Sequence, residues 1–343
     1  MSAPKKVLVV DDSAFIRKVF RQILSRSPDI EVVGTAADGD EALDLVERLK
    51  PDVVTLDLNM PDVDGVEFVR RQMARRPIPI VICSVAHASG AATLAALEAG
   101  AVDFLQKPTA LATDVVFDLA DELISKVMAA AGVDVERLRP ARAAPPVAVA
   151  PRRSALELIA IGLSTGGPQA LRSVIPRLPS DFPVPIAIVL HMPVGYTELY
   201  AARLDEISEL TVVEAKEGAA VVAGTVVIAA AGRHLRVARG PGKELVARLS
   251  LEPAGVPHRP SVDALFESAA EVCGAATLGV VLTGMGSDGL EGARRIKERG
   301  GRIVSESMAT CVVYGMPRSI EESGLSDYVT GLPDLPALLA QLV

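Results

Sequence analysis

Residues 53–65 read VVTLDLNMPDVDG, and this stretch decides the fold of the first part of the chain. Its first four residues are apolar or β-branched and fit a short buried strand, and Asp57 follows where that strand ends. Pro61 and Gly65 then indicate a loop. A buried strand that ends on a carboxylate is typical of an open parallel α/β sheet, in which ligands bind at the carboxyl ends of the strands.

Similar strand-like runs lie on both sides of this stretch and alternate with amphipathic helical segments. They span residues 7–10, 31–33, 80–83 and 102–105. Together with residues 53–56, these runs make five successive units of strand and helix. They predict an α/β domain with a parallel sheet over residues 1–131.

Polar side chains stand at the expected ends of these strands. Asp11 and Asp12 follow the first run, Ser84 ends the fourth and Lys107 ends the fifth. With Asp57 they should converge on one edge of the sheet. Three neighbouring carboxylates repel one another unless a cation lies among them, and oxygen ligands with room for water suit Mg²⁺. A lysine opposite these acids can pair with an incoming phosphoryl oxygen.

These motifs together resemble a response-regulator receiver domain across residues 4–127. The matching segments are DD at 11–12, TLDLNMPDVDG at 55–65, CS at 83–84 and FLQKP at 104–108. The resemblance implies a flavodoxin-like (βα)5 fold in which Asp57 accepts a phosphoryl group from a histidine kinase. It implies that Mg²⁺ is bound by Asp11, Asp12, Asp57 and the carbonyl of Asn59. It also implies that Ser84 and Lys107 engage the phosphoryl group and that Phe104 is the aromatic switch residue.

The composition changes at residues 132–154, GVDVERLRPARAAPPVAVAPRRS, which contain Pro140, Pro145, Pro146 and Pro151. Prolines at this density disrupt helices and sheet ladders, so we expect an extended, semi-rigid linker. The alternation then resumes and predicts a second, doubly wound and mostly parallel α/β domain over residues 155–343. Its strand-like runs span residues 158–161, 186–190, 211–213, 226–229, 278–282 and 302–305, and its helical stretches 169–175, 262–272 and 290–299. The tail GLPDLPALLAQLV predicts a final helix.

Three motifs of the second domain carry candidate chemistry. Ser164 lies in LIAIGLSTGGPQAL (158–171), His191 follows the strand-like run PIAIVL, and Asp288 lies in LGVVLTGMGSDGLEGA. Taken singly, each favours a plainer interpretation: a phosphate-binding or tight turn, a structural histidine, and a helix N-cap. Taken together, the three residues follow buried strands of one parallel sheet and should emerge at one edge. They therefore predict a nucleophile, its base and an orienting carboxylate.

A local rival is HRPSVD, which holds His258, Ser261 and Asp263 within six residues. We disfavour it as a triad because one loop or helix start would carry all three side chains. Ser261 is better explained as the N-cap of the helix that follows. His234 lies in a strand-like run and is expected to be structural.

The second domain resembles the catalytic domain of the chemotaxis protein-glutamate methylesterase (CheB) family. The matching segments are GLSTGGPQAL, HMPVGYT, ARLD, HRPSVDALFESAA, LTGMGSDG and VVYGMPRSI, over about residues 155–335. The order of receiver, Pro-rich linker and esterase domain matches too. The resemblance implies that Ser164 is the nucleophile, His191 the general base and Asp288 its orienter. Amides at the Thr165–Gly167 helix start (Thr165 and Gly166 foremost), with the loop at Met285, are then the candidates for holding the oxyanion.

The family implies hydrolysis of glutamyl γ-methyl esters on methyl-accepting chemoreceptors, with release of methanol, and deamidation of receptor glutamines. It implies a chemotaxis-type histidine kinase as phosphodonor, Mg²⁺ for the receiver and no cofactor for the ester chemistry. It also implies that the unphosphorylated receiver packs over the active site and that phosphorylation of Asp57 relieves this. We expect a cytoplasmic protein recruited to chemoreceptor arrays.

The composition excludes several other classes. The formal charge of −8 and the 3% of aromatic residues argue against binding of nucleic acid. The three widely spaced cysteines suggest neither a disulfide framework nor a zinc site and fit a reducing compartment. We expect no membrane insertion, since the start does not resemble a signal peptide and the apolar runs are too short. The remaining alternatives are a DNA-binding output domain, a mononucleotide site at the STGGP turn, and an esterase-like scaffold or an esterase of a non-flagellar chemosensory pathway.

Overall fold

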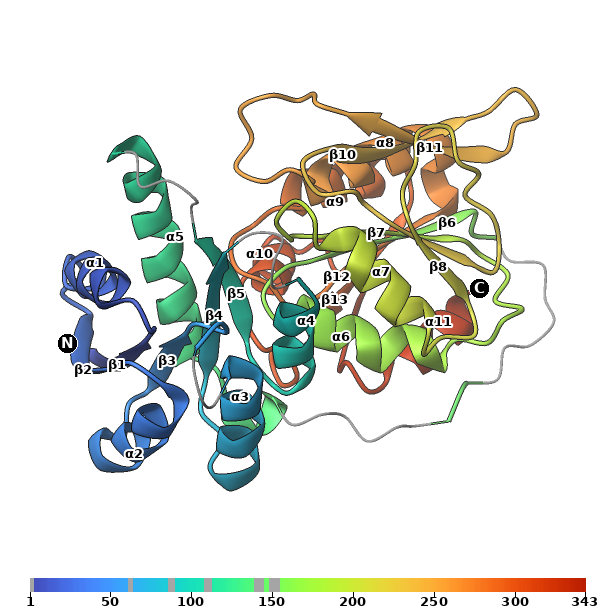
Figure 1. The fold of residues 1–343 in the computed structure, drawn as a ribbon. Helices are drawn as coiled ribbons and strands as arrows, with labels where there is room; N and C mark the ends of the chain where they lie inside the picture. The colour runs from blue at the N-terminus through green and yellow to red at the C-terminus, as the bar shows by residue number, and fades with distance from the viewer. Residues whose placement is uncertain (1–2, 61–63, 86–89, 108–112, 139–144, 148–154) are drawn as a thin grey trace. The chain divides into compact units, whose positions relative to one another are not determined.

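The computed structural model describes residues 3–60, 64–85, 90–107, 113–138, 145–147 and 155–343 (Figure 1). The chain divides into two compact units, Met1–Pro140 and Ala141–Val343. Most of the Pro-rich segment predicted to be a linker lies outside the described residues. No described helix is long and apolar enough to cross a membrane.

The first unit is a five-stranded parallel sheet between helices. Its strands are β1 (Lys5–Val10), β2 (Ile30–Ala36), β3 (Val53–Leu56), β4 (Ile80–Val85) and β5 (Asp103–Lys107). Its helices are α1 (Ala14–Leu24), α2 (Gly39–Leu49), α3 (Gly65–Arg75), α4 (Gly90–Glu98) and α5 (Thr113–Ala131), followed by a 3₁₀ turn at Val135–Leu138. The strand order β2-β1-β3-β4-β5 is that of flavodoxin-like sheets, so the predicted fold is confirmed.

Local sequence explains where these helices begin. Ser13, Asp38 and Asp64 each precede a helix, and their side-chain oxygens accept hydrogen bonds from the amides of Ile16, Glu41 and Glu67. These bonds satisfy amides that have no partner within the helix. The caps therefore fix each helix directly after the loop at the edge of the sheet.

The second unit contains a seven-stranded sheet of order β14-β13-β12-β6-β7-β9-β8, in which every pairing is parallel. The strands are β6 (Leu158–Leu163), β7 (Ile186–Leu190), β8 (Thr211–Glu214), β9 (Thr225–Ile228), β12 (Thr277–Val281), β13 (Arg302–Glu306) and β14 (Tyr328–Thr330). A separate antiparallel hairpin consists of β10 (His234–Arg239) and β11 (Leu245–Ser250). The mostly parallel α/β architecture is thus confirmed.

Helices flank this sheet on both faces (Figure 1). They are α6 (Gly167–Val174), α7 (Thr197–Asp205), α8 (Val262–Cys273), α9 (Leu290–Glu298), α10 (Met316–Glu322) and α11 (Leu335–Leu342). The last of them is the helix predicted for the tail. Short 3₁₀ turns follow α6 and α8, at Ile175–Arg177 and Gly274–Ala276.

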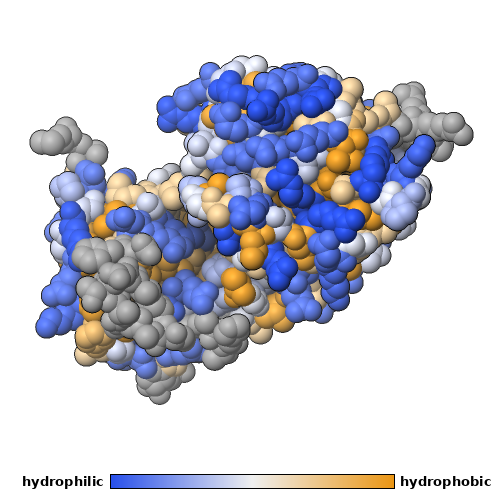
Figure 2. Space-filling view, turned by 90° about the horizontal axis from the view of Figure 1, so that it is seen from above, coloured by the Kyte–Doolittle hydropathy of each residue, from blue (hydrophilic) through white to orange (hydrophobic). Residues whose placement is uncertain are grey.

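Apolar burial holds the sheet and its helices together. Every residue of β6, β7 and β12 is buried, and the core continues into α8 through Leu265, Phe266 and Ala269. Figure 2 shows a surface that is largely hydrophilic, with apolar residues scattered over it. Because β6 lies between β7 and β12, the loops after these three strands open next to one another.

Candidate functional site

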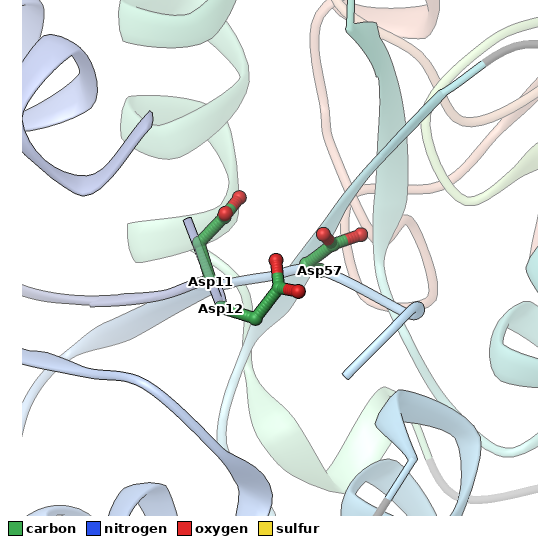
Figure 3. Close-up of side chains that lie close together, drawn as sticks. All are labelled: Asp11, Asp12 and Asp57. Atoms are coloured by element: carbon green, nitrogen blue, oxygen red, sulfur yellow. The ribbon is translucent and has the colours of Figure 1, made fainter. Parts of the chain in front are cut away.

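Two clusters of polar residues lie at the carboxyl ends of strands, one in each unit. In the first unit, β1 pairs with β3, and the amide of Asp57 donates to the carbonyl of Val10 at 2.9 Å. This pairing brings Asp57 beside Asp11 and Asp12, which follow β1. Carboxylate oxygens of the three residues lie within 4.8 Å of one another. Figure 3 shows all three side chains gathered at this edge.

Lys107 closes this acid cluster from β5. Its Nζ lies 2.5 Å from Oδ2 of Asp11 and 2.8 Å from Oδ2 of Asp57. Burial by itself lowers the pKa of Lys107, but the charges and hydrogen bonds of Asp57 and Asp11 outweigh it and raise that pKa. Burial raises the pKa of Asp11, against the attraction of Lys107. The lysine is therefore an ammonium ion that serves as the counterion of two buried carboxylates.

The donor set of this cluster fits Mg²⁺. It offers only oxygen atoms, and one of its members, Asp12, is exposed while Asp11 and Asp57 are buried. A hard cation that keeps several water molecules prefers such a site. The other predicted residues lie nearby in the fold: Ser84 is buried on β4, and Phe104 is buried on β5. The amide of Asn59 donates to Oδ1 of Asp57 at 3.3 Å.

In the second unit, strand register brings Ser164 and His191 together. Leu163 pairs with Leu190, and the amide of His191 donates to the carbonyl of Leu163 at 3.1 Å. On the other side, the amide of Ser164 donates to the carbonyl of Thr283 at 3.0 Å, just after β12. A Cβ atom on Gly284 would lie 2.9 Å from that of Ser164. The serine therefore lies between the loops after β7 and β12.

The turn after Ser164 is tight. Gly166 has a φ of +79° and precedes α6, and a Cβ atom there would lie 2.6 Å from Cβ of Val312. The amide of Gly167 donates to the carbonyl of Ser164 at 2.7 Å, so it is already used. Thr165 and Gly166, two of the predicted oxyanion candidates, stand between Ser164 and the start of α6. Met285, the third candidate, follows Gly284, where an added Cβ atom would lie 3.0 Å from the amide nitrogen of Ser164.

A buried network that the sequence did not reveal supports this turn. The hydroxyl of Thr283 donates to the carbonyl of Thr165 at 2.9 Å and accepts from the amide of Val313 at 2.9 Å. The amide of Thr283 donates to the buried carboxylate of Glu306 at 2.8 Å. Glu306 stands in none of the motifs quoted above, and Thr283 stands in LTGMGSDG without a predicted role. The available sequence signal is a charged residue directly after the strand-like run 302–305.

His191 is held by Asp288. Its Nε2 lies 2.8 Å from Oδ2 of Asp288, and both side chains are about nine-tenths buried. Nδ1 of His191 is buried and has no hydrogen-bond partner among the described residues. The ring of His258 stacks on that of His191, with centroids 4.2 Å apart. The imidazole thus has one nitrogen committed to a carboxylate and the other left for a proton.

Asp288 does not cap its own helix, as it would if the plain N-cap interpretation held. The N-cap of α9 is Gly289, and Asp288 turns instead towards the start of α8. Its carboxylate accepts from the hydroxyl of Ser261 at 2.9 Å and from the amides of Val262 at 2.8 Å and Asp263 at 3.1 Å. Burial alone raises its pKa, but the hydrogen bond and charge of His191, with these amides, hold the pKa well below its ordinary range.

The rival HRPSVD segment surrounds this pair and forms no separate triad. Ser261 occupies the predicted N-cap position of α8, but its side chain makes no capping hydrogen bond and donates to Asp288 instead. Oδ1 of Asp263 accepts from the amide of Gly292 at 2.7 Å. His234, expected to be structural, is fully buried in β10, and its Nδ1 accepts from the amide of Ser261 at 3.1 Å.

Glycines allow α8 to begin this close to the sheet. A Cβ atom on Gly162 of β6 would lie 2.2 Å from Cγ1 of Val262, and one on Gly289 would lie 2.8 Å from the same atom. Both distances are too short for real side chains, so the missing Cβ atoms make room for the first residue of α8. The amide of Val262 can therefore reach Asp288.

Asp263 makes the stability of the folded protein depend on pH. Burial first, and then the charge of Asp288, raise the pKa of Asp263 to about 6. A carboxyl whose pKa is raised by folding contributes stability below its unfolded pKa, and this contribution is lost as pH rises through the folded pKa. We expect Asp263→Asn, which keeps the oxygen that accepts from Gly292, to raise the melting temperature at pH above about 7 and to change it little below about 4. Thermal unfolding at both pH values checks this; an equal change at both would show that the ionisation of Asp263 does not affect the stability of the fold.

Comparisons with known proteins match each unit to a family. Residues 7–114 match the response regulator receiver domain family, and residues 159–339 match the CheB methylesterase family. A protein-glutamate methylesterase/protein-glutamine glutaminase 5 of Myxococcus xanthus is 48% identical over 99% of both chains. A protein of that name, without the number, from Geobacillus kaustophilus is 43% identical over 98% of both chains.

A solved structure matches the second unit. The CheB methylesterase catalytic domain of Thermotoga maritima is 44% identical, with a TM-score of 0.53, and the match covers 55% of this chain and 99% of that one. Family models, full-length relatives and a solved structure thus agree on the family of this chain. The chain belongs to the CheB family of protein-glutamate methylesterases/protein-glutamine glutaminases, in which a receiver domain precedes the methylesterase domain.

Proposed function

We propose that this chain removes methyl groups from glutamyl γ-methyl esters on the cytoplasmic helices of methyl-accepting chemoreceptors, and deamidates receptor glutamines, under control of Asp57 phosphorylation. Residues 1–131 act as the receiver domain, 132–154 as linker and 155–343 as the catalytic domain. The observation that carries the proposal is the His191–Asp288 hydrogen bond of 2.8 Å beside the Ser164 turn. It supplies an oriented base next to a hydroxyl, the arrangement that acyl transfer requires.

The ester is cleaved in two steps. Ser164 attacks the ester carbonyl while Nδ1 of His191 takes the hydroxyl proton, and a tetrahedral oxyanion forms. The amides of Thr165 and Gly166, with the loop at Met285, stabilise this negative charge. Methanol leaves with the proton from His191, and an acyl-enzyme remains. Water, activated by the same imidazole, then releases the glutamate and restores Ser164; with a glutamine substrate, ammonia leaves instead.

In this mechanism the two nitrogens of the His191 imidazole have different roles. Nε2 of His191 is committed to Asp288, so in the resting tautomer Nε2 carries the proton and donates it to the carboxylate. Nδ1 is then the lone-pair nitrogen that accepts the proton of Ser164. The ionised Asp288, whose pKa is held below its ordinary range, stabilises the imidazolium that forms during the reaction.

The first unit supplies the control. Asp57 would take the phosphoryl group, with Asp11, Asp12, Asp57 and the carbonyl of Asn59 holding Mg²⁺, whose charge offsets that of the transferred group. Lys107, already between Asp11 and Asp57, is placed to pair with a phosphoryl oxygen on Asp57. Ser84 and Phe104 would report the change within the receiver domain. The phosphodonor is a chemotaxis-type histidine kinase, and the protein works in the cytoplasm at receptor arrays.

We expect Asp57→Asn to abolish stimulation of methanol release by a small-molecule phosphodonor with Mg²⁺, while basal release stays within about twofold of wild type. The amide cannot form the acyl phosphate, and Asp57 is not part of the esterase site. Release is measured from methylated receptor membranes. Asp52→Asn, the same change at the other end of β3, should leave stimulation intact; the carboxylate of Asp52 accepts an exposed hydrogen bond from the amide of Lys6.

The same assay decides between the enzyme and its alternatives. Full stimulation in Asp57→Asn would place the phosphorylation site elsewhere. No release from any receptor preparation, despite phosphorylation of Asp57, would leave a receiver-linked scaffold or an esterase of another chemosensory pathway. Stimulated release from the wild type supports the methylesterase assignment directly.

A further inference from the structure

The start of α8 holds Asp288 from several directions at once. Four hydrogen bonds reach the carboxylate: Nε2 of His191 and the amide of Val262 on Oδ2, and the hydroxyl of Ser261 and the amide of Asp263 on Oδ1. An ionised carboxylate has about four acceptor sites, so this set fills it. Asp288 therefore has little freedom to rotate away from His191.

Of these four donors, two are side chains: the imidazole of His191 and the hydroxyl of Ser261. Ser261 is 5% exposed and occupies the N-cap position of α8, yet its hydroxyl turns away from its own helix to Asp288. A buried hydroxyl that donates to a charged acceptor contributes more than one that caps a neutral amide. The residue that the sequence pattern predicts to be an N-cap thus makes a hydrogen bond to a residue 27 positions away.

His234 fixes the backbone from which Ser261 acts. The imidazole is fully buried on β10, and its Nδ1 accepts from the amide of Ser261 at 3.1 Å. Burial comes first among the causes that lower the pKa of His234, so the ring is neutral and its Nδ1 can accept. Ser261 is thereby held at both its amide and its hydroxyl.

We propose that Ser261 is a positioning residue of the esterase site, which holds Asp288, and through it His191, in the orientation needed for proton transfer from Ser164. This inference rests on the proposed function. Ser261 touches neither the substrate nor the nucleophile in this role. It acts by keeping Oδ2 of Asp288 on Nε2 of His191, so that Nδ1 remains available to accept the proton of Ser164.

The test compares full-length wild type with Ser261→Ala, Ser261→Thr and Ser268→Ala. We expect Ser261→Ala to lower kcat for methanol release by about tenfold with KM unchanged, because a hydrogen bond to a charged group is lost from the chemical step alone. Ser261→Thr keeps the hydroxyl and should restore kcat to within about threefold of wild type. In proton NMR spectra, the far-downfield imidazole N–H resonance of His191 should weaken or shift in Ser261→Ala and return in Ser261→Thr.

Ser268→Ala is the matched control. Ser268 lies on the same helix, is buried, and bonds to the carbonyl of Leu265 and the amide of Val237, with no hydrogen bond to Asp288. Both alanine variants should lose comparable thermal stability, and kcat should fall only in Ser261→Ala. Equal kcat in the two, with an unchanged resonance, would overturn the positioning role. Absence of turnover in the wild type would instead overturn the proposed function, while the resonance would still test Ser261.

Discussion

Ser164→Ala is expected to reduce methanol release at least about 10⁴-fold while the catalytic unit stays folded. Loss of a serine nucleophile removes the covalent route, and what remains is catalysis by the oxyanion donors and by substrate binding. The fold should survive because both hydrogen bonds that hold Ser164 use its backbone. Its amide donates to Thr283 and its carbonyl accepts from Gly167, and alanine keeps both.

The measurement is kcat for methanol release, with circular dichroism and thermal unfolding to monitor the fold. Ser173→Ala is the matched control, since Ser173 lies on α6 after the same turn and its hydroxyl donates to the carbonyl of Gln169. That control should retain full activity. If Ser164→Ala turns over at a rate near that of wild type, the nucleophile lies elsewhere.

Asp288→Asn should be almost as damaging, with a loss of kcat of about 10⁴-fold. An asparagine has one acceptor oxygen where the carboxylate has two, and all four groups around it donate. If its NH₂ faces His191, Nε2 must accept, and the imidazole proton moves to Nδ1, the atom that has to receive the proton of Ser164. If the NH₂ faces Ser261 and Asp263, the amide of Asp263 meets another donor.

This variant should also lose stability, because each orientation leaves a buried donor without an acceptor, at a cost of about 1–3 kcal/mol. Denaturant unfolding measures that loss, and the pH profile of kcat shows the change of tautomer. Asp327→Asn offers a comparison, since Asp327 also accepts from a backbone amide across strands, that of Ile303, yet lies away from the triad. A full rate in Asp288→Asn would mean that His191 needs no orienting carboxylate.

The strand ends could be predicted from sequence because each reactive residue directly follows an apolar run. Asp57, Ser164 and His191 all stand at the first polar position after a buried strand, and period and burial locate such positions without any tertiary information. The shared edge of the sheet followed from the parallel topology. Both candidate clusters can therefore be predicted from the sequence alone.

The contacts between loops could not be predicted in this way. No local sequence pattern distinguishes a serine that caps its own helix from one whose hydroxyl reaches Asp288. The sequence around Ser261 therefore predicts a cap. The double pairing of Lys107 with Asp11 and Asp57 depends on β1, β3 and β5 all ending at one edge. The support of the Ser164 turn by Thr283 and Glu306 requires the strand order β13-β12-β6, which periodicity does not determine.

The close packing at Gly162 has a genetic meaning. This glycine offers no reactive group, yet any side chain there would push against Val262, whose amide holds Asp288. Missense alleles that abolish adaptation would therefore map to this glycine codon near the end of β6 as well as to the triad. A screen for loss of function would therefore recover mutations at packing positions such as Gly162 as well as at the catalytic residues.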